Sequence, residues 1–270
     1  MKQSQGAGAS GYLGWSLYFP FEEFSPEDMA SRATLIDGLP VAHYHTCPKA
    51  IRRMRGLTLD YSLLVKELDE KTKSIFMPAL LGEPELCIGS VGVAVFEVVY
   101  HGVSEEKVSK HKLNIRFAHY DKVTAIKKIK SNYIGKFTCV RGTIVRVGNI
   151  KPIVRQMDFH CGRCGSTMMR IFEDGKFSAP EKCATTHCRG RAFDPVRGSA
   201  VTVDWQKIRV QELMATGNDA GRVPRTIECE LTDDMVDAGV PGDVVTVAGI
   251  VKVMNPDLEK PGTCFRAVCE

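Results

Sequence analysis

Residues 137–157 read FTCVRGTIVRVGNIKPIVRQM. The first half, Phe137 to Val147, is rich in β-branched residues and predicts a strand, and Gly142 in its middle predicts a bulge or a sharp coil. Further short strands are predicted at Val201–Val203, Ile208–Leu213, Thr226–Leu231 and Val244–Val253. Pro241-Gly242-Asp243 is typical of a turn before the last strand. Short, strongly bent strands separated by turns favour a small β-barrel.

The amino-terminal part of the chain is predicted to be mainly helical. Ser25 and Pro26 supply an N-cap and a proline at the first helical position, and Gly38 follows the apolar run as a stop. A second apolar region begins at Leu57. Residues 101–112 are polar and charged, and predict a linker to a second domain.

Composition excludes several classes of protein. With 44% hydrophobic and 25% charged residues, the chain is typical of folded soluble proteins. The most apolar stretch, Leu86 to Tyr100, is interrupted by glycines and Glu97, so we expect no contact with a membrane. The first ten residues lack the apolar core of a secretory signal. Of ten cysteines, four form tight pairs and six are scattered, which favours metal binding in a reducing compartment over disulfides.

The net charge of +4 is unevenly distributed along the chain. Residues 1–121 hold 13 Lys/Arg against 15 Asp/Glu, and residues 164–270 hold 13 against 16. Residues 122–163 carry ten basic side chains and one acidic side chain, Asp158. This block is either a solvated strand face or a surface that faces a polyanion.

The strongest chemical signal is a set of four cysteines, Cys161-x2-Cys164 and Cys183-x4-Cys188, separated by eighteen residues. Each close pair can present two thiolates to one ion, and two pairs complete a tetrahedral S4 shell that suits structural Zn²⁺. His187 could replace Cys188 as the fourth ligand. An iron–sulfur cluster uses the same ligands, and the spacing excludes it only weakly.

Basic residues accompany the predicted barrel strands. Arg146 and Lys151 flank a Gly-Asn turn and could project to the same side of the sheet. Lys207 and Arg209 are two residues apart in a strand and therefore share a face. Such cations grip phosphates without reading bases. The aromatic side chains that could stack on bases, or lie in the core instead, are Trp205, Phe137 and Phe159.

No catalytic motif is present: the sequence lacks the Gly-x4-Gly-Lys-Ser/Thr phosphate-binding loop, the Gly-x-Ser-x-Gly elbow and the His-Glu-x-x-His pair. The fragment GSVG at residues 89–92 has no following lysine, and we interpret its glycines as allowing close helix packing. We therefore expect this chain to hydrolyse no ATP.

The ordered motifs between residues 113 and 254 resemble the amino-terminal part of the minichromosome maintenance (MCM) family. The matching stretches are Tyr133–Lys136, Arg141–Val147, Ile150–Pro152, the four cysteines, Trp205–Glu212, Val223–Glu228, Pro241–Asp243 and Ala248–Val251. The ordered series of these motifs is far more specific for the family than any single motif. Gly14–Phe19, Gly148–Pro152 and Trp205–Leu213 further resemble one paralogue group, which acts in recombination and repair rather than in the main replicative hexamer.

The resemblance implies an α+β fold, with a helical subdomain followed by an OB-fold β-barrel that carries an inserted zinc ribbon. The implied boundaries are a flexible tail at 1–11, the helical subdomain at 12–112, the barrel at 113–270, the ribbon at about 160–191 and a channel β-hairpin at about 251–267. Structural Zn²⁺ would be held by Cys161, Cys164, Cys183 and Cys188.

Family members form six-membered rings around DNA, and their zinc ribbons contact neighbouring subunits. The resemblance implies a nuclear DNA-binding and ring-assembly domain of an MCM-type helicase that acts in homologous recombination, repair and replication. Its implied partners are single-stranded DNA, duplex or forked DNA, and a homo- or hetero-hexamer with the ninth paralogue of the family. In the family, basic residues on the OB strands bind DNA. The matching positions are Arg146, Lys151, Lys207, Arg209 and, on the hairpin, Lys252.

The family's AAA+ motor, which binds ATP and Mg²⁺, would follow the hairpin, whereas the sequence stops at Glu270. We therefore expect a fragment without enzymatic activity, whose longer parent resembles an ATP-dependent DNA helicase. The alternative is a purely structural oligomerisation module whose basic face complements acidic neighbours in the ring. Steep salt dependence of binding to a free oligonucleotide would favour DNA binding over this alternative.

Overall fold

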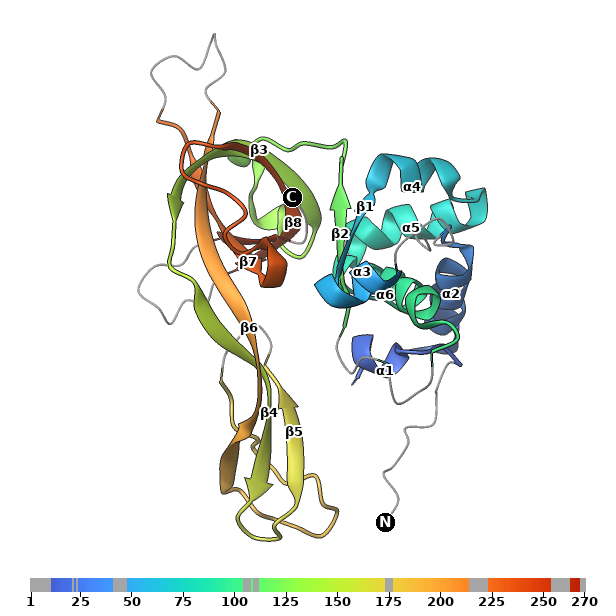
Figure 1. The fold of residues 1–270 in the computed structure, drawn as a ribbon, viewed down its shortest axis with the longest axis vertical. Coiled ribbons are helices and arrows are strands. Elements are labelled where there is room, and N and C mark those ends of the chain that lie inside the picture. Colours follow the sequence, from blue (N-terminus) through green and yellow to red (C-terminus); the bar gives the residue numbers. More distant parts are fainter. Residues whose placement is uncertain are drawn as a thin grey trace.

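The computed structural model describes residues 11–20, 22, 24–40, 48–103, 108, 112–172, 177–213, 223–253 and 263–267. Figure 1 shows a group of helices beside a curled sheet, from which a long ribbon extends. The first ten residues of the predicted tail lie outside this description. The architecture is α+β, as expected.

The helical subdomain is built around one long, buried helix. The helices are α1 (Trp15–Tyr18), α2 (Pro26–Gly38), α3 (Pro48–Met54), α4 (Tyr61–Glu67), α5 (Glu70–Gly82) and α6 (Pro84–Tyr100). The predicted cap of α2 is confirmed, because the Ser25 hydroxyl accepts a hydrogen bond of 3.2 Å from the Asp28 N–H. Within the described residues, no helix is both long and apolar enough to cross a membrane.

Two glycines let α1 and the segment after it pack directly against α6. A Cβ atom at Gly92 would lie 2.2 Å from a ring atom of Tyr18, and one at Gly89 would lie 2.9 Å from the ring of Phe19. Any side chain at these positions would displace an aromatic ring from the core. The interpretation of residues 89–92 as a close-packing segment is therefore confirmed.

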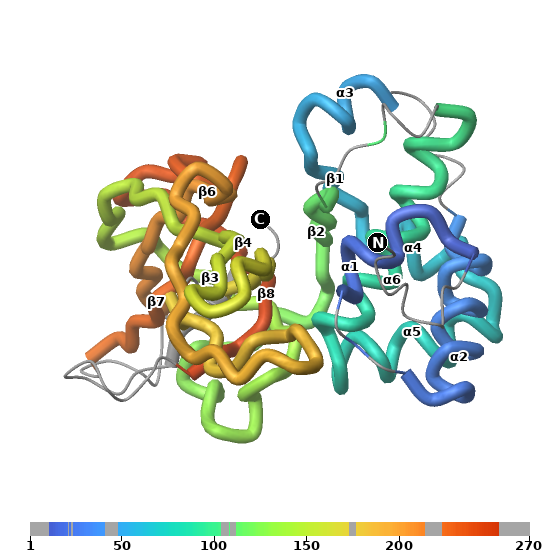
Figure 2. The backbone as a smooth tube through the Cα atoms, turned by 90° about the horizontal axis from the view of Figure 1, so that it is seen from below, coloured from blue at the N-terminus to red at the C-terminus, as the bar shows by residue number. Residues whose placement is uncertain are grey.

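The helical subdomain also contains a small parallel sheet that the sequence does not predict. β1 (Gly56–Asp60) lies in the region that begins at Leu57 and is predicted to be helical, and it pairs in parallel with β2 (Asn114–Ala118). β2 falls within the range 113–270 that the resemblance implies for the barrel. Its Phe117 is fully buried in the same core as the helices, so this strand belongs to the helical side of the predicted boundary. Figure 2 shows β2 between the helices and the other sheet.

The second sheet curls on itself in the manner of an OB-fold barrel. Its barrel strands are β3 (Phe137–Val147), part of β6 (Phe193–Glu212), β7 (Thr226–Thr232), β8 (Val244–Val253) and β9 (Thr263–Ala267). The pairing order β3–β8–β9–β7–β6 returns to β3, and β7–β9 is its parallel pair. Ile144, Ile208 and Val210 are among the side chains that fill its interior. The short 3-10 helices η3 (Ile126–Lys128) and η4 (Ser131–Tyr133) precede β3, and η6 (Asp233–Met235) follows β7.

Gly142 is the point at which β3 changes partners. It pairs with Val245 of β8 on one side and with Glu212 of β6 on the other. A Cβ atom there would lie 2.3 Å from the carbonyl oxygen of Gln211, so only glycine permits this crossing. The predicted sharp coil at Gly142 is therefore confirmed, and the irregular register lies slightly further on, between Ile144 and Arg146.

Two barrel strands extend outward to form the base of the ribbon, and the predicted segment at about 160–191 lies at its tip. β4 (Lys151–Cys161) pairs with β6 from the Lys151–Trp205 position at the barrel to the Cys161–Phe193 position at the tip. β5 (Thr167–Ile171) adds a third strand. β6 is therefore one strand of 20 residues where sequence analysis predicts two shorter ones. A small core of Met157, Phe159 and Phe172 stabilises the ribbon.

Polar contacts and a shared core join the two subdomains. Arg116 of β2 is buried and forms an ion pair with Asp234 of η6, and the Asn114 side chain donates a 3.0 Å hydrogen bond to Asp233. Phe137 at the start of β3 packs in the core of the helical subdomain.

Candidate metal site and basic face

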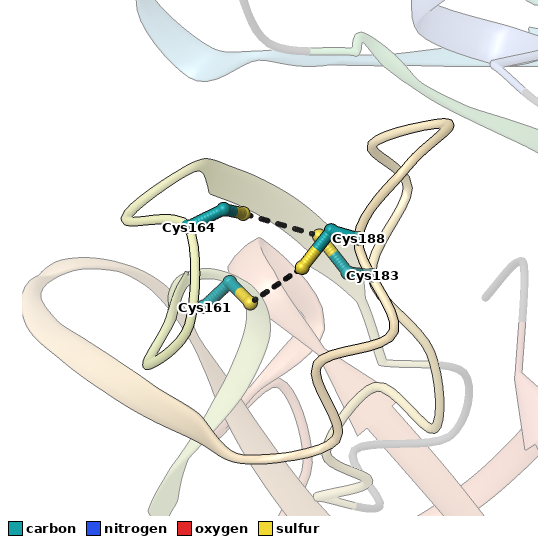
Figure 3. Close-up of side chains that lie close together, drawn as sticks. All are labelled: Cys161, Cys164, Cys183 and Cys188. Atoms are coloured by element: carbon teal, nitrogen blue, oxygen red, sulfur yellow. Dashed lines mark hydrogen bonds between the residues drawn. The ribbon is translucent and has the colours of Figure 1, made fainter.

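Four thiols meet at the tip of the ribbon. Cys161 ends β4 and Cys164 lies in the turn before β5, whereas Cys183 and Cys188 lie in the loop that leads to β6 (Figure 3). The Sγ atoms of Cys161 and Cys188 are 3.8 Å apart, and those of Cys164 and Cys183 are 3.6 Å apart. All four Sγ atoms lie within 4.8 Å of one another. The structure thus brings together all four predicted ligands.

These distances fit a tetrahedral S4 site. A Zn–S bond of about 2.3 Å places tetrahedral sulfur atoms about 3.8 Å apart, whereas a disulfide requires about 2.05 Å. His187, the alternative ligand, is outside the cluster that the described residues form. His160 forms a 2.9 Å hydrogen bond with the Thr167 hydroxyl, which makes it an ordinary neighbour of the site. The donor set and its spacing therefore suit Zn²⁺.

Hydrogen bonds divide the thiols into more and less acidic members. Ser166 lowers the pKa of Cys164 to about 6 and also lowers the pKa of Cys183. The Gly190 N–H donates a hydrogen bond to Cys188 that lowers its pKa, but burial and the neighbouring thiols together raise it to about 11. The tip therefore supplies thiolate near neutral pH, and a central cation would stabilise the remaining thiols as thiolates too.

Gly190 is a part of the site that sequence analysis misses. A Cβ atom at this position would lie 2.6 Å from the Sγ of Cys161 and 3.3 Å from the Sγ of Cys188. The backbone at Gly190 therefore passes so close to these two sulfur atoms that a side chain would collide with them. A glycine two residues after the last cysteine of the motif is the sequence signal that could have indicated it.

The second candidate site is a basic face on the outside of the barrel, defined here as Arg146, Lys151, Trp205, Lys207 and Arg209. Along β6, the last three of these alternate with inward-facing side chains that are buried (Gln206, Ile208 and Val210). The register adds the other two, because Lys151 lies opposite Trp205 and Arg146 lies opposite Arg209. Opposite residues of an antiparallel pair project to the same side of the sheet. Four of the five predicted DNA contacts therefore share one face.

A bulge in β3 brings Arg146 onto this face. The register steps from Ile144 opposite Val210 directly to Arg146 opposite Arg209, which leaves Val145 as an extra residue. Without the bulge, Val145 would lie opposite Arg209. β-Bulges commonly redirect a side chain in this way.

Glu228 of β7 is a second residue that sequence analysis misses. Its Oε2 lies 3.0 Å from the Lys207 Nζ, and its Oε1 lies 2.8 Å from an Arg209 guanidinium nitrogen. One carboxylate thus bridges both cations. The Arg209 and Lys207 hydrogen bonds hold the pKa of Glu228 below its usual value, so it is ionised at neutral pH.

The fifth predicted DNA contact, Lys252, lies elsewhere. Its Nζ is 2.6 Å from the Glu85 carboxylate in the first turn of α6, beside a cavity of about 450 Å³ between the α5–α6 corner and β8. The structure thus places Lys252 at the contact between the subdomains rather than on the basic face. Lys260, on the same predicted hairpin, lies outside the described residues.

The three aromatic candidates have different environments. Phe137 and Phe159 are 2% and 0% exposed and belong to cores, as the structural interpretation predicts. Trp205 is half-buried on the basic face, with the Lys207 Nζ 5.8 Å from its ring centre. The neighbouring Gln206 is buried and bonds Gly148 and Asp237, which fixes the turn between β3 and β4.

Comparison with known proteins agrees with the family that the sequence motifs resemble. Residues 125–255 match the MCM OB domain family. The protein named DNA helicase MCM8 of Homo sapiens is 37% identical over 268 residues, which cover 91% of this chain and 32% of that protein. The probable DNA helicase MCM8 of Oryza sativa subsp. indica is 38% identical over 255 residues, which cover 92% of this chain and 32% of that protein. The chain spans about a third of the length of these curated relatives.

Proposed function

Residues 125–255 make this chain a member of the MCM family, and we propose that it is the DNA-binding and ring-assembly part of an MCM-type helicase. The resemblance that the sequence motifs indicate is confirmed, including the paralogue group, because several relatives that match over about 90% of the chain are named DNA helicase MCM8 or probable DNA helicase MCM8. Helicase activity, ATP and Mg²⁺ belong in this proposal to a longer parent protein.

The basic face carries the proposal for DNA binding. Arg146, Lys151, Lys207 and Arg209 project to one side of the barrel, and Trp205 lies among them. Cations that follow strand edges bind the phosphate backbone, and an aromatic ring among them can stack on a base. This combination suits single-stranded DNA, with duplex or forked DNA as the other candidate ligands.

The cysteine cluster would hold structural Zn²⁺ at the end of the ribbon. Cys161, Cys164, Cys183 and Cys188 supply four sulfur donors and leave no open coordination position, so the ion would order the tip rather than catalyse a reaction. A rigid tip far from the barrel suits contact with a neighbouring subunit. We propose a homo- or hetero-hexamer, with the ninth MCM paralogue as the hetero-hexamer partner.

The proposed biological role rests on the paralogue group to which the named relatives belong. We propose that the parent protein acts in the nucleus in homologous recombination, repair and replication. The alternative is that this part only assembles the ring and has no affinity for DNA of its own. Ion pairs on the barrel, such as Lys207–Glu228, would then simply stabilise the folded chain.

Fluorescence anisotropy of a labelled single-stranded oligonucleotide across a salt series tests the proposal. We expect binding that weakens steeply with salt, because phosphate contacts release counterions. The double substitution Arg146→Ala/Lys151→Ala should weaken binding and flatten the log–log salt slope by about 1.4, which is about 0.7 for each phosphate contact on a single strand, with an unchanged melting temperature. No binding at low salt would favour the assembly alternative, and an equal loss of stability would mean that these residues are structural.

A further inference from the structure

The carboxylate of Glu228 lies among the cations of the basic face. Glu228 uses one carboxylate oxygen for Lys207 and the other for Arg209, at 3.0 and 2.8 Å. Both cations project from the part of β6 that belongs to the barrel, where it pairs with β7. A phosphate group presents the same arrangement of negatively charged oxygen atoms, so Glu228 and a phosphodiester would compete for the same donors.

The neighbouring acidic residue on β7 does not share this arrangement. Glu230 projects to the same face and lies directly opposite Lys207 in the register, whereas Glu228 lies opposite Arg209. Among the described residues, the ion pairs of Lys207 and Arg209 with β7 are made by Glu228 and none is made by Glu230. The two glutamates carry the same charge on the same strand and differ in what they contact.

We propose that Glu228 is a built-in competitor for phosphate that sets the DNA affinity of the basic face, an inference that rests on the DNA-binding function proposed above. Without DNA, its carboxylate holds Lys207 and Arg209. A phosphodiester must displace the carboxylate to use these cations. Arg146 and Lys151, which are exposed at the two ends of the face, make the first contacts.

The exposure of the three side chains permits this exchange. The side chains of Lys207, Arg209 and Glu228 are 27%, 43% and 31% exposed, so solvent and a bound strand can reach them. Ion pairs of this kind contribute little to stability, which means that breaking them costs little. The displaced carboxylate stays close to the bound phosphate, and repulsion between the two anions lowers the affinity.

The consequence for DNA binding is a moderate affinity. A face with four unopposed cations would hold a strand tightly, and a competitor among these cations shortens the lifetime of each contact. Glu228 also keeps the two long side chains ordered in the absence of DNA. The two features therefore have opposite effects on the affinity for DNA. The bulge in β3 raises it by aligning Arg146 with the face, and the Glu228 carboxylate lowers it by holding Lys207 and Arg209.

Two matched substitutions, Glu228→Gln and Glu230→Gln, test this inference. Both remove one negative charge from the same face of β7 and keep the side-chain shape. We expect Glu228→Gln to raise the affinity for a single-stranded oligonucleotide about three- to ten-fold at low salt, and to steepen the log–log salt slope by about 1. Glu230→Gln should change the affinity by at most about two-fold and leave the slope unchanged. Thermal melting of both variants serves as the control for folding.

The outcomes separate this inference from the proposed function. If the unsubstituted chain binds DNA but the two variants behave alike, the competitor role is overturned and DNA binding stands. If Glu228→Gln binds DNA and the unsubstituted chain does not, the competitor role is supported, because Glu228 then prevents DNA binding in the unsubstituted chain. If no variant binds at low salt, both the competitor role and DNA binding by this face are overturned.

Discussion

At the tip of the ribbon, four thiols converge over a core of three buried side chains among the described residues, whereas the basic face lies on a barrel whose own core holds ten. The tip therefore has little apolar surface to fix its own geometry, and a bound ion would supply folding energy there. The basic face takes its geometry from strands that pack on this larger core. We expect ligand removal to unfold the first site and to leave the second in place.

Cys183→Ser, which removes one of the four predicted zinc ligands, should have the largest effect on the difference between the two regions. We expect loss of the bound zinc and loss of amide protection in residues 157–172 and 177–193, because structural zinc contributes folding energy directly. The barrel strands should keep their protection. Zinc analysis and hydrogen exchange measure the two effects, and self-association should weaken in parallel if the tip contacts a neighbouring subunit.

His187→Gln is the matched control for that substitution. It removes the alternative ligand that sequence analysis leaves open, beside Cys188. We expect it to retain zinc. Zinc loss in His187→Gln with retention in Cys188→Ser would show that the ligand set is wrong.

Gly142→Ala tests the packing of the barrel, where β3 crosses from β8 to β6. The new methyl group would meet the Gln211 carbonyl oxygen at 2.3 Å and a Val210 methyl group at 2.6 Å. We expect destabilisation of the barrel by about 1–3 kcal/mol in denaturant unfolding. Gly198→Ala, where nothing lies within 4 Å, is the control. Equal stability of the two variants would mean that the crossing of β3 over β6 is not as close as the structure places it.

Gly190→Ala sharpens the comparison because it changes the tip without removing a ligand. The methyl group would press on the Cys161 and Cys188 sulfur atoms, so we expect the zinc affinity to fall about 10- to 100-fold, as for other residues that orient ligands. The midpoint of barrel unfolding should not change. Competition with a chelator measures the affinity, again with Gly198→Ala as the control, and a normal affinity would contradict the geometry.

The smallest effect is expected on the face itself, as a function of pH. The Arg209 and Lys207 hydrogen bonds lower the folded-state pKa of Glu228, so its stabilising contribution is complete above the unfolded value of about 4.3 and is lost as the pH falls through the lowered folded value. We expect the melting temperature of Glu228→Gln to lie slightly below that of the unsubstituted chain at pH 7 and to approach it at pH 3. A gap that widens on acidification would contradict this ion pair.

The two regions also differ in how far the sequence predicts them. Residue type and spacing largely determine a four-cysteine cluster, so the spacing of the four cysteines is enough to predict that they lie together. Gly190 is missed because its role depends on a close approach to two sulfur atoms that spacing does not reveal.

The basic face is only partly predictable because it depends on register. Period-2 alternation places Lys207 and Arg209 on one side of β6. The alignment of Arg146 requires the bulge at Val145, and the bridge to Glu228 requires the pairing of β6 with β7, which no local pattern encodes. Lys252 is predicted for the DNA surface, and its contact with Glu85 depends on how the subdomains pack.

The most direct test of DNA binding by the barrel is photocrosslinking to a single-stranded oligonucleotide that carries 5-iodouracil, followed by mass spectrometry of the linked peptides. We predict cross-links to Trp205 and its neighbours on β6, and none to the cysteine loops at the tip. Cross-links confined to the tip or to the helical subdomain would contradict the assignment of DNA binding to the basic face.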